Sequence, residues 1–295
     1  MRFPFFSFIV LAVMCRFTAH AQESLFVQDS LKMVGSGFSF TEGCSPDQEG
    51  NVFFTDQPND KVWKYSLKGE MSVFMEKSGR ANGTYFDKKG NLIICADEKG
   101  QLWSVDKLGK ITVLLDNWNG KQMNGPNDIW LDAKGGVYMT DPYYQRPYWT
   151  RRQPDIPTQD TYYLPKGSKK AIMVTNGLKQ PNGIVGSADG KTLFISDIAD
   201  GKTYKYAIGR GGMLGDKQLL ISRGSDGMTI DIAGNLYLTA NEGVYIYDKN
   251  GQFLALIKVP KGASNVCFWG KNRDSLFITA KDAVYSIAMT TTGVE

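Results

Sequence analysis

Short apolar runs alternate with turns that contain Asp and Gly along this chain. A clear copy is the segment 127–141, where the run 129–131 is followed by a turn with Asp132 and Gly135 and then by the run 137–140. Two β-rich runs separated by such a turn are typical of a β-hairpin. Asp bonds the backbone two residues further on, and Gly adopts a positive φ at low cost. The segment therefore predicts two antiparallel strands.

A polar residue precedes the first apolar run of this hairpin, and the same arrangement occurs six times. The six anchor residues are Glu42, Asn82, Asn127, Asn182, Asp226 and Asn265, and they recur at intervals of 39 to 55 residues. Self-similarity at roughly this period indicates propeller blades or another repeat array. Because the units are rich in β-forming residues, a propeller is favoured over a helical solenoid.

Each repeat contains further strand signal after its hairpin. Alternating runs rich in β-branched and aromatic residues predict third strands at 62–65, 102–105, 161–164, 203–206, 244–247 and 284–287, and fourth strands at 72–75, 111–114, 171–174 and 254–257. The last repeat lacks a fourth strand, which residues 25–37 can supply. The sequence thus predicts an all-β fold, a six-bladed β-propeller with four antiparallel strands per blade, closed by an N-terminal strand that removes exposed edges.

Residues 1–21 have the features of a secretory signal peptide. Arg2 gives a positive start, residues 3–14 are largely apolar, and Ala19-His20-Ala21 fits a cleavage site with small residues. The segment is therefore excluded from the predicted fold, and one propeller domain is expected over residues 22–295.

The signal predicts a location outside the cytoplasm. Cleavage near Ala21 gives a secreted or periplasmic protein. A bacterial lipoprotein signal at Cys15 is the alternative, and the bulky Met14 before that cysteine disfavours it.

The composition predicts no membrane or nucleic-acid partner. With 42% hydrophobic and 22% charged residues, the chain has the balance of an ordinary globular protein. The mature part contains no run approaching the roughly 18 apolar residues of a transmembrane helix. Loss of Arg2 and Arg16 with the signal lowers the formal net charge from +4 to about +2, and no basic run remains.

Histidine and cysteine usage excludes several catalytic classes. The single histidine, His20, leaves with the signal, so Ser-His-Asp and Cys-His catalysis and histidine-ligated zinc are excluded for the mature chain. Cys44, Cys95 and Cys267 are widely spaced and form no Cys-x-x-Cys motif, so they indicate no metal–thiolate site. We expect these three to be buried free thiols.

The anchor residues form a candidate metal site. In a propeller the first strand of each blade lines the central channel, so residues that begin these strands converge at one end of the axis. All six anchors carry oxygen: two are carboxylates and four are amides. Calcium takes six to eight such ligands, whereas magnesium prefers tight octahedral geometry with several waters. The alternative is that Asn and Asp merely begin strands and cap turns.

The motifs around the anchors resemble those of the regucalcin (senescence marker protein) and gluconolactonase family, over nearly the whole mature chain. The matching motifs are Glu42-Gly43, Pro126-Asn127-Asp128, Thr140-Asp141-Pro142, Pro181-Asn182-Gly183 with Ser196-Asp197, and Ser225-Asp226-Gly227-Met228. The sequence departs from the family at Cys44 and Ser225, where proline is usual, and neither position supplies a ligand.

The resemblance implies a six-bladed propeller with one catalytic divalent metal, usually Ca²⁺, on its axis. It also implies that Glu42, Asn127, Asn182 and Asp226 are the ligands, and that Asp226 can act as the general base. A metal with open positions polarises a carbonyl and positions water, so hydrolysis of a sugar lactone such as a gluconolactone is expected. Asp226 and a metal-bound hydroxide both remain candidates for the group that activates water.

A long insert over residues 142–160 is expected on the same face as the metal. Its aromatic and arginine side chains suit a polyhydroxylated or anionic substrate through stacking and bidentate contacts; the alternative is a loop that packs its own aromatics. The candidate substrate-binding residues are Asn82, Asn265, Tyr144, Arg146 and Trp149. Asp56, Asp141 and Asp197 end second strands and are expected to form turn or blade-to-blade hydrogen bonds.

Three functions fit these features. The first is a calcium-dependent sugar lactonase, the second a non-catalytic, calcium-stabilised propeller that binds a glycan or protein, and the third a hydrolase that acts on a phosphoester. Four protein ligands leave open positions on a calcium ion, which favours catalysis over a structural metal. The sequence therefore predicts a lactonase.

Overall fold

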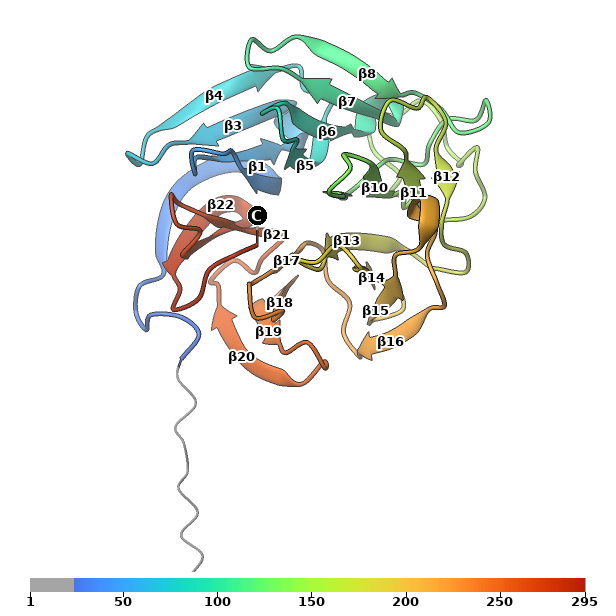
Figure 1. Ribbon diagram of the computed structural model, residues 1–295. Coiled ribbons are helices and arrows are strands. Elements are labelled where there is room, and N and C mark those ends of the chain that lie inside the picture. The colour runs from blue at the N-terminus through green and yellow to red at the C-terminus, as the bar shows by residue number, and fades with distance from the viewer. Residues whose placement is uncertain (1–23, 295) are drawn as a thin grey trace, which may run out of the picture.

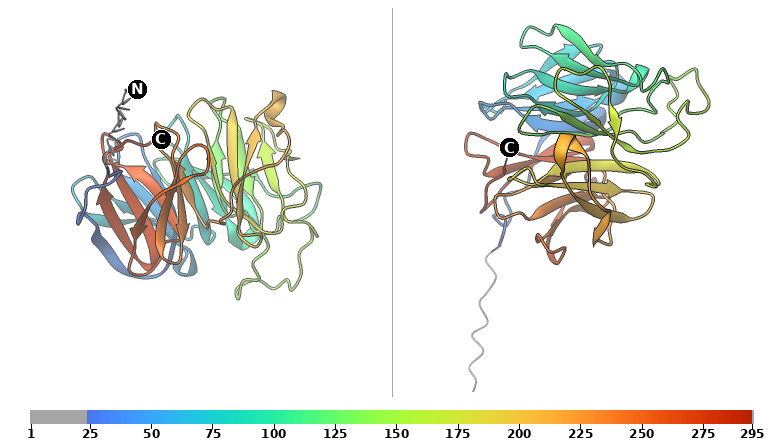
Figure 2. Two further views of the ribbon diagram at one scale, coloured as in Figure 1. Left: turned by 90° about the horizontal axis from the view of Figure 1, so that it is seen from below. Right: turned by 45° about the vertical axis from the view of Figure 1, so that its right-hand side comes forward.

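The computed structural model describes residues 24–294, and the predicted signal peptide lies outside the described residues. The described chain forms antiparallel sheets arranged around a central axis (Figure 1). Seen from the side, the ring is a thick disc, and the segment coloured yellow-green projects from one of its faces (Figure 2). The all-β propeller predicted from the repeats is therefore observed.

Four of the sheets have four strands each, in the order in which the chain supplies them. The first consists of β5(Ala81–Phe86), β6(Leu92–Ala96), β7(Gln101–Val105) and β8(Ile111–Leu115), and the second of β9(Ile129–Leu131), β10(Val137–Thr140), β11(Thr161–Leu164) and β12(Ile172–Met173). The third consists of β13(Pro181–Gly186), β14(Thr192–Asp197), β15(Lys202–Ala207) and β16(Gln218–Ile221). The fourth consists of β17(Met228–Ile230), β18(Leu236–Ala240), β19(Gly243–Tyr247) and β20(Phe253–Lys258). The strand β16 was missed by the sequence prediction.

The fifth sheet has six strands, and it corrects the predicted number of blades. Its order is β21(Asn265–Trp269), β22(Ser275–Ala288), β1(Lys32–Pro46), β2(Val52–Asp56), β3(Lys61–Tyr65) and β4(Met71–Glu76). The prediction of six separate four-stranded blades is therefore wrong: the ring contains five blades. The reason is that β1 and β22 are long, continuous strands that pair with each other, so the first and last repeats share one hydrogen-bonded sheet.

The N-terminal part of β1 joins the two ends of the chain. Lys32 and Met33 pair with Ser286 and Tyr285 of β22, while the C-terminal part of the same strand pairs with β2. A β-sheet edge left open at the last repeat would present unpaired N–H and C=O groups. Residues from the start of the chain pair with that edge and supply the strand that the last repeat lacks.

Burial follows the position of each strand in its sheet. The second strands β2 and β6 are buried at every residue, because neighbouring sheets pack against both of their faces. The outermost strand β4 is mostly exposed or half-buried, with one buried residue, as expected for a strand at the edge of its sheet. The six first strands β1, β5, β9, β13, β17 and β21 contact one another in cyclic order around the axis.

The predicted turn chemistry is confirmed at the hairpins that join first and second strands. Asp47 Oδ1 accepts hydrogen bonds from the backbone N–H groups of Glu49, Gly50 and Asn51 at 2.9–3.0 Å. Asp87, Asp132 and Asp231 repeat this arrangement in other sheets. These carboxylates are therefore committed to the turns.

The aspartates that end second strands hold the backbone that leads into the first strand of the same repeat. Asp141 accepts hydrogen bonds from the N–H groups of Asn124 and Gly125 at 2.9 and 2.8 Å. Asp197 does the same for Lys179 and Gln180, at 2.7 and 2.9 Å. The predicted hydrogen-bonding role is confirmed, but the bonds stay within one repeat and place the anchor residue.

A side-chain hydroxyl next to each of these aspartates links the second strand to the following repeat. Thr55 Oγ1 donates to the carbonyl oxygen of Asn82 at 3.1 Å, and Thr140 Oγ1 donates to that of Asn182 at 2.8 Å. The anchors therefore have fixed backbone positions relative to the preceding repeat.

Cys44, Cys95 and Cys267 are buried free thiols, as predicted. The described residues contain no helix that is long and apolar enough to cross a membrane.

Replacing Asp141 tests how strongly this carboxylate stabilises the ring. We expect Asp141→Ala to lower the free energy of unfolding by about 2–3 kcal/mol, because two buried N–H groups lose their acceptor, and the melting temperature by roughly 5–10 °C in calorimetry. Burial raises the pKa of Asp141 from 3.8 to about 7. The folded state therefore holds an extra proton between about pH 4 and pH 7, so the loss should be largest at and below about pH 4 and should shrink as the pH rises to 7.

Asp197→Ala is the matched control. It removes two equivalent hydrogen bonds and a third, longer one from the N–H of Asp200 at 3.2 Å. Lys179 and Gln180 are more exposed than Asn124 and Gly125, so water can replace the carboxylate. A loss for Asp197→Ala equal to or greater than that for Asp141→Ala would contradict this account.

Candidate active site on the propeller axis

Interruptions in strand pairing place three of the anchor residues on the axis. In β1 the register shifts between Glu42 and Ser45, in β5 between Ala81 and Thr84, and in β13 between Pro181 and Ile184. A β-bulge of this kind inserts an extra residue, bends the strand and redirects a side chain. The anchors lie at or beside these bulges, which explains how side chains within a continuous strand reach the centre of the ring.

Glycine after an anchor lets neighbouring first strands approach closely. A Cβ on Gly43 would lie 2.0 Å from the carbonyl oxygen of Asn82, and a Cβ on Gly227 would lie 2.3 Å from the amide carbon of Asn265. No other residue fits such a space without movement of the backbone or of the next anchor. The recurring anchor-Gly pair therefore reflects the crowding of the first strands at the axis.

Two carboxyl groups from distant parts of the chain meet at this point. Glu42 is buried at 5% exposure, whereas Asp226 remains partly exposed. Loss of hydration is the largest cause that raises the pKa of Glu42 well above its usual value, and the charge of Asp226 raises it further. Burial also raises the pKa of Asp226 to about 6. Two acidic groups in contact, of which Glu42 is buried, favour a bound cation.

The amide anchors flank this carboxyl pair. Asn182 Nδ2 donates to Asp226 Oδ1 at 2.8 Å and to the hydroxyl oxygen of Tyr144 at 3.0 Å. Asn265 Nδ2 lies 3.4 Å from Glu42 Oε2, while its own Oδ1 accepts the N–H of Val266 at 2.8 Å. The structure thus brings Glu42, Asn182, Asp226 and Asn265 into one contact network.

Asn82 and Asn127 complete the ring through their backbones. The N–H of Gly83 donates to the carbonyl oxygen of Asn127 at 2.6 Å, and both anchors are buried. The described contacts place the two residues beside each other on the axis. Their predicted roles, Asn127 as a metal ligand and Asn82 as a substrate residue, stay predictions.

Asp128 is a third acidic residue that the sequence analysis did not assign to the site. It is buried at 6% exposure, and its charge contributes to the raised pKa of Glu42. Its Oδ1 accepts the N–H of Ile129 at 3.0 Å. The family motif contained this residue, but only the ring geometry shows that it faces the same channel as Glu42.

The donor set fits a hard cation. Asn182 Oδ1 is buried and has no hydrogen-bond partner, which leaves an oxygen lone pair unpaired beside the two carboxyl groups. Among the described residues, no group of three or more His, Cys, Asp or Glu side chains could hold a metal by itself. A cation at this site therefore depends on amide oxygen as well as carboxylate, which is the ligand chemistry that calcium uses.

The insert places two of its three predicted substrate residues beside the anchors. Tyr144 reaches Asn182 through its hydroxyl, and the Arg146 guanidinium lies over the Tyr144 ring at 5.2 Å. Trp149 is placed differently: it is 5% exposed, and its Nε1 donates to the carbonyl oxygen of Asp97 at 3.2 Å. Tyr144 and Arg146 therefore lie near the anchors, whereas Trp149 is buried and bonds the backbone of Asp97.

A cavity of about 730 Å³ opens at the other end of the axis, where the first strands end in the Asp-Gly turns. Its wall includes Tyr85, Trp130 and Leu164, with Lys89 and Lys134 at the turns. The turn carboxylates there already accept backbone N–H groups, as described above. The chemistry expected from the anchors is therefore found at the opposite mouth.

Fold and site together define an all-β propeller with an oxygen-rich acidic cluster at one mouth of its channel. The chain belongs to the SMP-30/Gluconolactonase/LRE-like region family, whose sequence profile matches residues 40–282. The family predicted from the motifs is thus confirmed.

Three relatives illustrate this membership. The gluconolactonase of Zymomonas mobilis is 28% identical over 314 aligned positions, which cover 94% of this chain and 86% of that protein. A structure of a gluconolactonase from Xanthomonas campestris superposes with a TM-score of 0.86 at 25% identity, covering 92% of this chain and 93% of that one. Regucalcin from Agrobacterium tumefaciens, described as calcium-binding, has a TM-score of 0.76 at 20% identity, covers 88% of this chain and 94% of its own, and is similar in fold alone.

Replacing Gly227 tests the close approach at the axis. We expect Gly227→Ala to lower the free energy of unfolding by about 1–3 kcal/mol, because the added methyl collides with the Asn265 amide. Chemical denaturation measures this change. Gly215→Ala is the control, since the nearest atom to its added Cβ is 3.6 Å away, and it should be nearly neutral. If both variants unfold alike, the first strands are not as tightly packed as described.

Proposed function

We propose that this protein is a lactonase that hydrolyses the ring ester of a sugar lactone such as a gluconolactone, with one divalent cation, Ca²⁺, at the anchor cluster. The observation that carries the proposal is the contact of Glu42 with Asp226 beside the unpartnered Oδ1 of Asn182. The relatives named gluconolactonase support a lactonase, as the sequence analysis predicted.

The residues that would hold the cation are Glu42, Asn127, Asn182 and Asp226. Two carboxylates balance a divalent charge, and the amides add oxygen without adding charge. When bound, the cation supplies a Lewis acid that polarises a carbonyl oxygen. Asn182 has a second function in this arrangement, because its Nδ2 donates to Asp226 and fixes the direction of its own oxygen.

Asp226 is the acidic anchor that water and substrate can reach. Glu42 and Asn182 are 5% and 2% exposed, whereas Asp226 is only partly covered. Its Oδ1 is held by Asn182, so the carboxylate has a fixed orientation. We therefore assign to Asp226 the removal of a proton from the attacking water, and to Glu42 a role in holding the site.

The insert would bind the sugar ring. Tyr144 offers a hydroxyl next to Asn182, and Arg146 presents a planar cation with several N–H donors. Such groups match the hydroxyls of a polyhydroxylated lactone. Asn82 and Asn265 would contact the same substrate from the axis, where they are buried beside the carboxyl pair.

Removal of the metal tests the cation. Wild-type protein should hydrolyse an aldonolactone in the presence of Ca²⁺ and lose nearly all of that activity with excess chelator, with recovery on adding Ca²⁺ back. Release of acid in a pH-indicator assay measures the rate. Activity that survives complete chelation contradicts the metal. No hydrolysis of any aldonolactone with Ca²⁺ present favours the alternative of a non-catalytic binding protein.

Substitution of Asp226 tests the proton transfer. Asp226→Asn keeps an oxygen but removes the charge and the proton acceptor, so kcat/KM at saturating Ca²⁺ should fall by roughly 100-fold or more. Calcium affinity measured by calorimetry should fall less than in Asp226→Ala. The control for metal binding is Asn82→Ala, which is not an assigned ligand and should bind Ca²⁺ nearly as the wild type does. Full activity of Asp226→Asn would show that another group takes the proton.

A further inference from the structure

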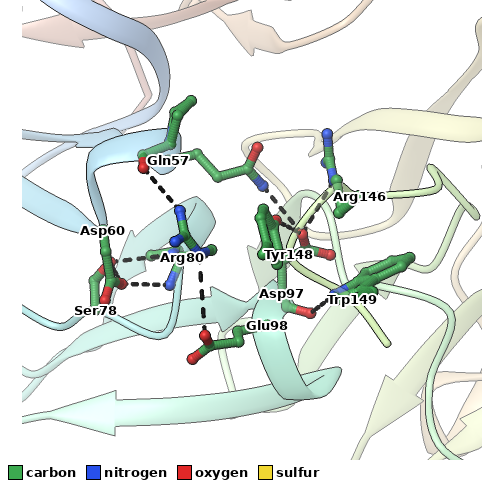
Figure 3. Close-up of polar contacts among 11 residues, drawn as sticks. Gln57, Asp60, Ser78, Arg80, Asp97, Glu98, Arg146, Tyr148 and Trp149 are labelled. Atoms are coloured by element: carbon green, nitrogen blue, oxygen red, sulfur yellow. Dashed lines mark hydrogen bonds and ion pairs between the residues drawn. The ribbon is translucent and has the colours of Figure 1, made fainter. Parts of the chain in front are cut away.

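A second network of charged and aromatic side chains lies where the insert meets the loops of the first two repeats (Figure 3). We refer to it as the Asp97 cluster, and its members are Gln57, Arg80, Asp97, Arg146, Tyr148 and Trp149. Asp97 is 1% exposed and begins the short 3₁₀ helix η2(Asp97–Lys99) after β6. A buried carboxylate needs several donors to offset its lost hydration, and most of its donors come from the insert.

Asp97 binds the insert through both its side chain and its backbone. Its Oδ2 accepts Arg146 Nε at 3.1 Å, and the hydroxyl of Tyr148 donates to the same oxygen. Gln57 Nε2 adds a third donor at 3.3 Å. The carbonyl oxygen of Asp97 accepts Trp149 Nε1. One buried residue of the second repeat therefore holds three side chains of the third repeat's insert.

Arg80 supports the same part of the insert from the other side. Its guanidinium lies over the Tyr148 ring at 4.3 Å, and its Nη1 donates to the carbonyl oxygen of Pro58 at 2.7 Å. Its Nε lies 4.0 Å from Glu98. Tyr148 is thus held between a cation and a carboxylate, and Arg80 connects this contact to Pro58 of the first repeat.

Arg151 attaches the middle of the insert to the segment before β9. The guanidinium stacks on the Trp149 ring at 4.0 Å, and its Nη1 donates to the carbonyl oxygen of Met123 at 2.9 Å. This segment leads to the anchor Asn127. The insert is consequently not a loop that packs only against itself, which was the alternative considered from the sequence.

The contacts at Asp97 determine which groups of Arg146 face the anchors. Arg146 Nε is used by Asp97, and Figure 3 shows a guanidinium nitrogen pointing away from that carboxylate. The same guanidinium lies over Tyr144, whose hydroxyl meets Asn182. Asp97 therefore fixes Arg146, Arg146 packs on Tyr144, and Tyr144 touches an anchor.

We propose that Asp97 is a positioning residue that holds residues 144–149 over the anchor cluster, so that Tyr144 and Arg146 bind the hydroxyl-bearing ring of the substrate. Asp97 itself acts through these two side chains and does not contact the reacting atoms. The effect on substrate affinity rests on the proposed function, whereas the attachment of the insert can be measured without any activity.

The first test is the variant Asp97→Asn, which keeps the shape but removes the charge that pairs with Arg146. Two readouts are used on the full-length protein. Trypsin should cut after Arg151 and Arg152 about tenfold faster than in the wild type, because the insert is released more often. With an aldonolactone at saturating Ca²⁺, KM should rise about tenfold, which corresponds to ~1.4 kcal/mol, while kcat changes less than about threefold.

Asp231→Asn is the matched control. Asp231 is also 1% exposed and accepts a tyrosine hydroxyl, that of Tyr237 at 3.1 Å, but it lies in a turn at the opposite mouth of the ring. This variant should lose stability without faster cleavage at Arg151 and Arg152 and without a change in KM. Tyr148→Phe, which removes one donor to Asp97 and keeps the ring over Arg80, should give a smaller change of the same kind.

The two readouts separate the possible outcomes. Wild-type cleavage rates in both Asp97→Asn and Tyr148→Phe overturn the attachment. Faster cleavage with an unchanged KM overturns the role in substrate binding, and an equal loss in kcat points to a general structural defect instead.

If the wild type hydrolyses no aldonolactone, the proposed function fails and with it the substrate part of this inference, while trypsin cleavage still decides whether Asp97 holds the insert. If Asp97→Asn does not fold, Tyr148→Phe decides both readouts.

Discussion

The structure depends on how backbone groups at the crowded axis are hydrogen-bonded. Six first strands meet there, and the space left beside Gly43 or Gly227 admits no additional carbon atom. Buried N–H and C=O groups cannot rely on water in such a place. Asp141 and Thr140, one after the other in the chain, solve the problem by bonding the segment before one anchor and the carbonyl of the next. The anchors are precise because their backbone has these partners.

The same crowding brings two acidic side chains into contact at the axis. Glu42 comes from the first repeat and Asp226 from the fifth, and the ring forces them together with little hydration. Like charges in contact destabilise a folded protein unless a proton or a cation is shared between them. An arrangement of this kind loses stability in exchange for chemistry, which is common where a protein holds a reactive centre. The unpartnered oxygen of Asn182 belongs to the same pattern.

The insert breaks the near-symmetry of the ring. The anchors are similar from repeat to repeat, so they alone offer a substrate little asymmetry. Residues 142–160 place Tyr144 and Arg146 on one side of the axis. Asp97 of the preceding repeat binds Arg146 and Tyr148. Because the attachment uses a buried carboxylate and stacked rings, the insert has one preferred position relative to the anchors. Under the proposed function, the anchors would supply the chemistry and the insert would supply substrate recognition.

The sequence by itself determined the all-β class, the phase of the repeats, the anchor residues and the family, because these depend on local periodicity and turn chemistry. It did not reveal β16, a short and partly exposed strand with weak local signal. The number of blades was decided by long-range pairing, since β1 and β22 join distant parts of the chain into one sheet. The contact of Glu42 with Asp226, the place of Asp128 in the channel and the burial of Trp149 against Asp97 also depend on residues far apart in sequence. Only the closed ring brings these residues together, because no local pattern records which side chains meet across its axis.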